Sequence, residues 1–89
     1  MKLVVTVIGK DQVGIIAMVS RALADNNINI LSINQNIMDG FFNMVMLAET
    51  TDNKTKLADL QNLLREKGAT LNLEIKIQHE DIFKTMHEV

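Results

Sequence analysis

A short polar turn, Lys10 to Gly14, carries the residue types best suited to bind a ligand. It joins an apolar run to a helical pattern, so a strand ends where a helix begins. Unpaired backbone N–H groups and a partial positive charge of about half an electron collect at such a point, where a carboxylate or phosphate can bind. Gly14 has no side chain, so a ligand can approach these amides. Asn29, which opens the next apolar run, is expected nearby and offers an amide that both donates and accepts hydrogen bonds.

A purely structural interpretation of the same turn stays open. Asp11 is a good N-cap residue for the helix that follows. Gly14 can simply allow that helix to pack closely on the sheet. A capped turn by itself is therefore a weak indication of a ligand site.

The chain contains two histidines, His79 and His87, close to Glu80, Asp81 and Glu88. These residue types can ligate a metal, but only the histidines fall near one helical face and no HExxH-like spacing exists. The chain has no cysteine, which excludes disulfides, thiolate metal sites and cysteine nucleophiles. We therefore predict no metal, no cofactor and no catalytic residues.

The composition limits the classes of function. The chain has 89 residues, of which 47% are hydrophobic and 22% charged, and this predicts one small folded domain, residues 1–89. The net charge is −2 and the basic residues are scattered, which opposes nucleic-acid binding. No apolar stretch reaches the roughly 18 to 20 residues of a membrane span, and the N-terminus lacks a signal-peptide pattern. We expect a cytoplasmic protein that binds neither nucleic acid nor membranes.

Two elements flank the polar turn. Lys2 to Ile8 is an apolar, β-branched run typical of a strand in the middle of a sheet. Val13 to about Asn26 has helical periodicity. The stripe expected to face the sheet contains Ile16, Ala17, Ser20, Leu23 and Ala24. A second apolar patch of Ile15, Met18, Val19 and Ala22 then needs another cover, which makes Met18 and Ala22 candidate interface residues.

A β-hairpin follows. Ile28 to Met38 and Phe41 to Thr50 have strand patterns, and the Asp39-Gly40 pair between them is a strong two-residue turn signal because both positions need positive φ. Polar side chains recur at alternate positions of the first of these strands, at Ser32, Asn34 and Asn36, and so share one face. They indicate an interface, a position beside a ligand, or a solvated sheet face.

The last third of the chain predicts a helix, a strand and a short helix. Four leucines, at positions 57, 60, 63 and 64, form one helical stripe, with Asp52 or Asn53 as the cap and Gly68 at the end. Leu71, Leu73, Ile75 and Ile77 alternate with polar residues, which is typical of an edge strand. Glu80 to Val89 predicts a short helix that packs back on the body through Ile82, Phe83 and Met86.

The element order is therefore βαββαβ with a terminal helix. Two interleaved right-handed crossovers give an α+β, ferredoxin-like fold with a four-stranded antiparallel sheet and two helices on one face. This fold hosts many unrelated activities, so it does not identify the function.

The sequence resembles the ACT domain, a small regulatory module. The resemblance covers nearly the whole chain and is carried by a D-x-x-G-I turn at Asp11 to Ile15, a D-G-[FY]-F hairpin at Asp39 to Phe42, and an I-F-x-x-M ending at Ile82 to Met86. It is closest to small stand-alone ACT proteins of bacteria and archaea. The chain is also similar to the ACT regions of formyltetrahydrofolate deformylase and of the glycine-cleavage repressor.

The resemblance implies a homodimer, or a higher oligomer, that binds an amino acid or similar metabolite between subunits and signals to an unidentified regulated protein. Family members hold the ligand with polar residues at the positions of Asp11 and Asn29. Backbone amides from Gln12 through Val13, Gly14 and Ile15 to Ile16 complete that site. Gly9 stands where serine-binding members carry histidine, and a carboxylate at Asp11 favours an ammonium group.

Three other functions share this fold. A ligand-free dimerisation adaptor is compatible with the same sequence. An acylphosphatase needs an arginine in the loop that here contains Lys10 and Asp11, and a carboxylate would repel phosphate. An RNA-binding module needs a basic residue where Asp39 stands and further aromatic residues after Phe42.

Overall fold

The computed structural model describes residues 1–52 and 54–87, with the backbone alone for residues 85–87. The elements in chain order are β1 (Lys2–Lys10), α1 (Ile15–Asp25), β2 (Ile28–Met38), β3 (Phe41–Thr50), α2 (Leu57–Ala69), β4 (Leu73–His79) and α3 (Glu80–His87). The predicted order βαββαβ with a short C-terminal helix is confirmed.

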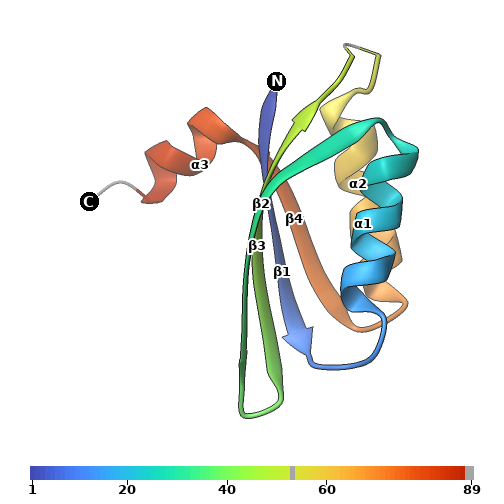
Figure 1. The fold of residues 1–89 in the computed structure, drawn as a ribbon, viewed down its shortest axis with the longest axis vertical. Coiled ribbons are helices and arrows are strands. Elements are labelled where there is room, and N and C mark those ends of the chain that lie inside the picture. Colours follow the sequence, from blue (N-terminus) through green and yellow to red (C-terminus); the bar gives the residue numbers. More distant parts are fainter. Residues whose placement is uncertain (53, 88–89) are drawn as a thin grey trace.

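The strands form one four-stranded antiparallel sheet in the order β2-β3-β1-β4. α1 and α2 both cover the same face of this sheet (Figure 1). The predicted central position of β1 and the predicted edge position of β4 are both confirmed. β2 forms the other edge.

Alternate residues of each strand point toward the helices and build the core. Leu3, Val5 and Val7 of β1 are fully buried, and their partners across the sheet include Met46 and Ile77, which lie opposite Val5. α1 and α2 add mainly leucine and valine side chains to this layer. Burial of these aliphatic groups at about 25 cal/mol per Å² is the main stabilising contribution.

The face of α1 that packs on the sheet is not the predicted one. The buried residues are Ile15, Val19, Ala22 and Leu23, whereas Ile16 is 38% exposed and Ala17 and Ala24 are exposed. The patch that was expected to need another cover therefore lies against the sheet itself. The prediction failed because α1 is apolar around most of its circumference, so periodicity could not choose between two overlapping stripes.

The turns follow the sequence signals. Asp39 and Gly40 have φ values of 50° and 79°, which confirms the two-residue hairpin with positive φ at both positions. α1 ends before Asn26, and Asn27 takes the left-handed conformation with φ of 58°. The hairpin lies beside the polar turn, because the Asp11 N–H donates a hydrogen bond to the Gly40 carbonyl at 2.7 Å.

Both predicted ends of α2 are wrong. The N-cap residue is Lys56, and the Asp52 carboxylate instead accepts a hydrogen bond from the Lys54 N–H at 3.1 Å, within the preceding loop. Asn53, the other predicted cap, lies outside the described residues. Gly68 is buried inside the helix, and the left-handed residue after the helix is Asn72, with φ of 56°.

α3 contacts β1 and β4 and leaves the sheet on the side opposite α1 and α2 (Figure 1). Lys84 Nζ lies 2.9 Å from Glu80 Oε1, one turn away. This hydrogen bond holds the pKa of the Glu80 carboxyl below its usual value and raises the pKa of the Lys84 ammonium. Ile82 is 54% exposed and Phe83 is half-buried, and the side chain of Met86 lies outside the described residues.

Candidate functional site at the first turn

The turn between β1 and α1 leaves the start of α1 uncapped. The residue at the N-cap position is Gly14, and no side chain caps the helix. The Met18 N–H donates to the Gly14 carbonyl at 3.0 Å, so helix geometry gives the N–H groups of Ile15 to Ala17 no acceptor within the helix. The expectation that Asp11 caps α1 is wrong: Asp11 is exposed and lies three residues before the N-cap. The amides remain available to a ligand.

Gly14 is required by its backbone conformation. Its φ is +95°, and a Cβ added there would meet no atom within 4 Å. The alternative that Gly14 allows close packing of helix on sheet is therefore wrong. Close approach occurs at Gly9, where a Cβ would lie 2.6 Å from Leu73 Cδ2. The position that carries histidine in serine-binding relatives is thus crowded by β4.

We expect Gly14→Ala to lower the free energy of unfolding by about 1 to 2 kcal/mol, because an L-residue is strained in the left-handed region. Gly14→Asn is the matched control. Asparagine tolerates this conformation, so this variant should lower the free energy of unfolding by less. Urea denaturation followed by circular dichroism measures both. Equal stability of Gly14→Ala and the wild type would show that the turn relaxes to a negative φ.

Gln12 already uses its side-chain amide within the chain. Its Nε2 donates to the Leu71 carbonyl at 2.9 Å and to the Lys10 carbonyl at 3.1 Å. The half-buried side chain therefore ties the first turn to the segment that precedes β4. No signal in the sequence indicated this contact. Only the backbone amide of Gln12, and not its side-chain NH₂, is left for a ligand.

Asn29 does not lie near Asp11 in the same chain. Asn29 pairs with Glu49, which pairs with Lys2, whereas Lys10 pairs with Phe41 at the hairpin end. Lys2 and Lys10 are eight residues apart on an extended strand, which at about 3.3 Å per residue separates Asn29 from the hairpin end by roughly 26 Å along the sheet. α1 carries the chain back to the starting end of β1, so β2 begins at the opposite end of the sheet from the turn (Figure 1). The expected proximity within one chain is wrong.

The remaining predicted ligand residues divide into two kinds. Val13 is 99% exposed in the turn, whereas the side chain of Ile15 is buried in the core. Ile15 can therefore offer only its backbone amide.

The candidate interface residues do not form one surface. Ser32, Asn34 and Asn36 are exposed on β2 and face the side of the sheet opposite α1 and α2, since their partners on β3 alternate with buried Met44 and Met46. The register shift at Leu31 puts Ile30, which pairs with buried Ala48, on the other face. Ala22 is buried in the core of this chain and Met18 packs against that core.

An apolar strip follows the free edge of β2. Leu31, Ile33 and Ile37 are exposed large apolar residues along it, with Ile33 at 48%. These residues alternate along the strand past the bulge, and this alternation is the sequence signal that indicates them. Exposed apolar residues on an unpaired edge strand are typical of a surface that pairs with another strand.

Among the side chains that the structure describes, in residues 1–52 and 54–84, no group of three or more His, Asp or Glu is arranged to hold a metal ion. His79 instead takes part in the start of α3, where its Nδ1 accepts a hydrogen bond from the Asp81 N–H at 3.2 Å. The same part of the chain contains no helix long and apolar enough to cross a membrane.

A ferredoxin-like sheet with α1 and α2 on one face, a free edge strand and an uncapped turn after its first strand defines a class of small α+β modules. Within this class, the model of the ACT domain family matches residues 1–78. The chain belongs to the ACT domain family, whose members are regulatory modules.

Relatives and solved structures agree with this assignment. A UPF0237 protein of Clostridium perfringens is 46% identical over 89 residues, which cover both chains completely. A UPF0237 protein of Methanocaldococcus jannaschii is 47% identical over 88 residues, covering 99% of this chain and 98% of the relative. The structure of an ACT domain protein from Streptococcus pneumoniae matches with a TM-score of 0.83 and 39% identity over 94% of each chain.

Two more distant structures show the same fold. A formyltetrahydrofolate deformylase from Pseudomonas putida has a TM-score of 0.79 at 14% identity, covering 89% of this chain and 29% of the enzyme. A putative glycine cleavage system transcriptional repressor has a TM-score of 0.75 at 22% identity, covering 89% of this chain and 47% of the repressor. The resemblances found in the sequence are confirmed at the level of the fold.

Proposed function

We propose that the chain is a single, non-catalytic regulatory module of the cytoplasm that pairs with a second copy and binds an amino acid or similar small metabolite between the two. The first turn of one copy and Asn29 of the other form the site. Occupancy then signals to a regulated protein. The separation of Asp11 from Asn29 within one chain is the observation that carries the proposal.

A two-fold pairing of β2 strands joins the separated halves of the site. β2 is an eleven-residue edge strand, and its full antiparallel pairing with a second β2 sets the Ile28 end of one copy against the Met38 end of the other. Asn29 of one copy then lies at the hairpin end of the other copy, where the Asp11 N–H bonds to Gly40. The same pairing buries Leu31, Ile33 and Ile37 and satisfies the unpaired edge.

The chemistry of the two halves suits an α-amino acid. The free amides at the start of α1 favour a carboxylate through their N–H groups and the helix dipole. The Asp11 carboxylate favours an ammonium group. Asn29 adds a donor and an acceptor from the second copy. No histidine contributes at position 9, so the ligand is held without an imidazole.

Mixing two inactive variants tests whether the site spans two copies. Asp11→Ala and Asn29→Ala, each alone, are expected to abolish or strongly weaken the heat of amino-acid binding in isothermal titration. A mixed dimer contains one site with both substitutions and one site with neither. Free exchange of subunits should therefore restore roughly a quarter of the wild-type sites.

Ile33→Lys is the control for pairing. It places a charge at the centre of the β2 edge, so sedimentation velocity should show single copies, and titration should show no binding. If the mixture of Asp11→Ala and Asn29→Ala stays inactive while the wild type binds, the site does not cross between copies. If the wild type pairs but gives no heat with any amino acid, the chain is a ligand-free adaptor.

A further inference from the structure

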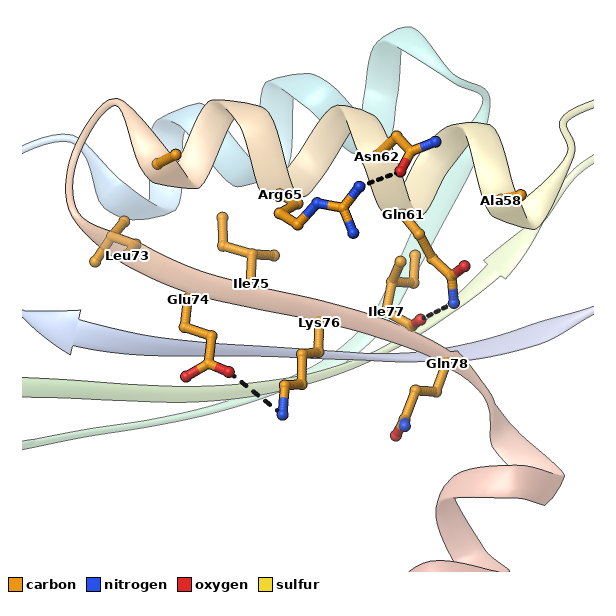
Figure 2. A pocket seen from close by; sticks show the side chains of 11 residues that line it. Ala58, Gln61, Asn62, Arg65, Leu73, Glu74, Ile75, Lys76, Ile77 and Gln78 are labelled. Atoms are coloured by element: carbon orange, nitrogen blue, oxygen red, sulfur yellow. Dashed lines mark hydrogen bonds and ion pairs between the residues drawn. The ribbon is translucent and has the colours of Figure 1, made fainter.

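A groove of about 560 Å³ runs along the outer edge of β4, beneath α2 (Figure 2). It extends from Leu73 to Gln78 on β4. The α2 residues that line it are Ala58, Gln61, Asn62, Arg65 and Ala69, whose spacing of three and four places them on one stripe of the helix. The groove therefore has the length and direction of a short extended strand.

Backbone groups of β4 point into this groove. β4 is an edge strand whose neighbour in the sheet is β1. Gln61 Nε2 donates a hydrogen bond to the Ile77 carbonyl at 2.9 Å, so this carbonyl faces away from β1 and toward α2 (Figure 2). Ile75, two residues earlier, directs its backbone N–H and C=O to the same side. The edge thus offers the hydrogen-bonding pattern that an added strand requires.

The side chains around the groove define the chemistry of its occupant. Ala58 and Ala69 leave apolar space near its two ends, and Arg65 lies at the middle of the stripe. Lys76 Nζ is 3.3 Å from Glu74 Oε1, so these two charges neutralise each other. Arg65 Nη2 donates to the neutral Asn62 Oδ1, and no carboxylate of the described residues forms an ion pair with Arg65. An occupant with apolar ends and a central carboxylate complements this arrangement.

We propose that the groove captures an extended segment of another protein, which adds to β4 as an antiparallel outer strand. The helix-facing side chains of that segment are apolar, with one Asp or Glu opposite Arg65. Its N–H groups donate hydrogen bonds to carbonyls of β4 such as that of Ile77. In the free chain this carbonyl accepts a hydrogen bond from the Gln61 side chain instead. The segment is a route by which a regulated protein can bind the module.

A second copy of the chain fits this groove less well than an isolated strand. α2 makes its sheet contacts mainly with β4, so it lies over the edge strand itself. A second β4 would lie about 4.8 Å away and would carry its own α2, whereas packed helices need about 8 to 10 Å between axes. An isolated extended segment has no helix above it and avoids this clash.

Fluorescence anisotropy with a designed probe tests the groove. The probe is the peptide Thr-Val-Thr-Glu-Thr-Val-Thr with an N-terminal fluorophore and an amidated C-terminus. Its valines and its glutamate share one face of the extended strand. The wild-type chain is expected to bind it saturably, and Arg65→Glu to weaken binding about tenfold because an attraction becomes a repulsion. Lys67→Glu, with the same charge change on α2 outside the groove, should stay within about twofold.

Two altered peptides sharpen the test. A probe with lysine in place of glutamate should prefer Arg65→Glu over the wild type. A probe with N-methylated valines should lose binding, because methylation removes backbone donors that pair with β4. Absence of saturable binding by the wild type, or equal binding of the N-methylated probe, would overturn the proposal. A change in oligomeric state, rather than in peptide affinity, on Arg65→Glu would assign the groove to a second copy instead.

Capture of a strand at this groove does not depend on the two-copy ligand site. β4 and β2 form opposite edges of the sheet. The Ile33→Lys variant should therefore bind the probe as the wild type does, and a loss of binding there would link the two surfaces.

Discussion

Val19→Asp is expected to destabilise the protein severely. Val19 has no exposed surface and lies in the core, so a carboxylate at this position would be buried without a charged partner. Burial of an unpaired charge places such a substitution in the most destabilising class, at about 4 kcal/mol or more. A domain of this size has a total stability of about 5 to 15 kcal/mol. The far-ultraviolet circular dichroism and the urea midpoint should both fall sharply at neutral pH.

Ala17→Asp, on the same helix, is expected not to destabilise the protein. Ala17 is exposed and lies in the first turn of α1, where a carboxylate interacts favourably with the helix dipole by about 0.3 to 1 kcal/mol. Its stability should equal or slightly exceed that of the wild type. The decrease in the free energy of unfolding caused by Val19→Asp should also become smaller as the pH is lowered, because protonation removes the buried charge. A stable Val19→Asp beside an unfolded Ala17→Asp would mean that α1 packs through the other stripe.

Gly68→Ala is expected to destabilise the protein although alanine is the better helix former. In an exposed helix interior this change gains about 1 kcal/mol. At position 68 the new Cβ would lie 2.9 Å from the Leu73 carbonyl oxygen and 2.9 Å from Ile75 Cγ1. The carbonyl belongs to the backbone and cannot rotate away, so α2 must move off β4. We expect a net loss of about 1 to 3 kcal/mol, typical of an overpacked core.

Glu66→Ala is the matched control for Gly68→Ala. Glu66 is exposed on the same helix, so its replacement should change the free energy of unfolding by less than about 0.5 kcal/mol. Urea denaturation measures the free energy of unfolding of both variants, and the difference between them distinguishes the effect of packing against β4 from the effect of helix propensity. A more stable Gly68→Ala variant would show that α2 and β4 can separate slightly at no cost.

Local patterns predicted the elements and their order. The β-branched run of β1, the Asp39-Gly40 turn and the alternation from Leu71 to Ile77 each reflect a constraint that acts within a few residues. Right-handed crossovers then leave few ways to arrange such elements, so the ferredoxin-like sheet also followed. Amide groups at the start of α1 could be predicted as a site because they arise wherever a helix begins.

The prediction that Asn29 lies near Asp11 in one chain was wrong, although the predicted topology already implies that the two residues lie far apart. A crossover helix returns the chain to the end of the sheet at which the first strand began. The start of β2 must therefore lie far from the end of β1, and a site that uses both residues requires a second copy. The bulge at Leu31 was not predictable, because it depends on how β2 pairs with β3.

The sequence by itself determined which segments are helices and strands, where the hairpin turns and where unpaired amides begin a helix, because short-range sterics and hydrogen bonding decide these. The tertiary structure alone decided which side of α1 is buried, that Gln12 is tied to Leu71, that Gly68 touches β4, and that a groove opens beside Arg65. Each of these depends on the distance between elements remote in the chain. That distance is set by how all the side chains pack together, which no local pattern records.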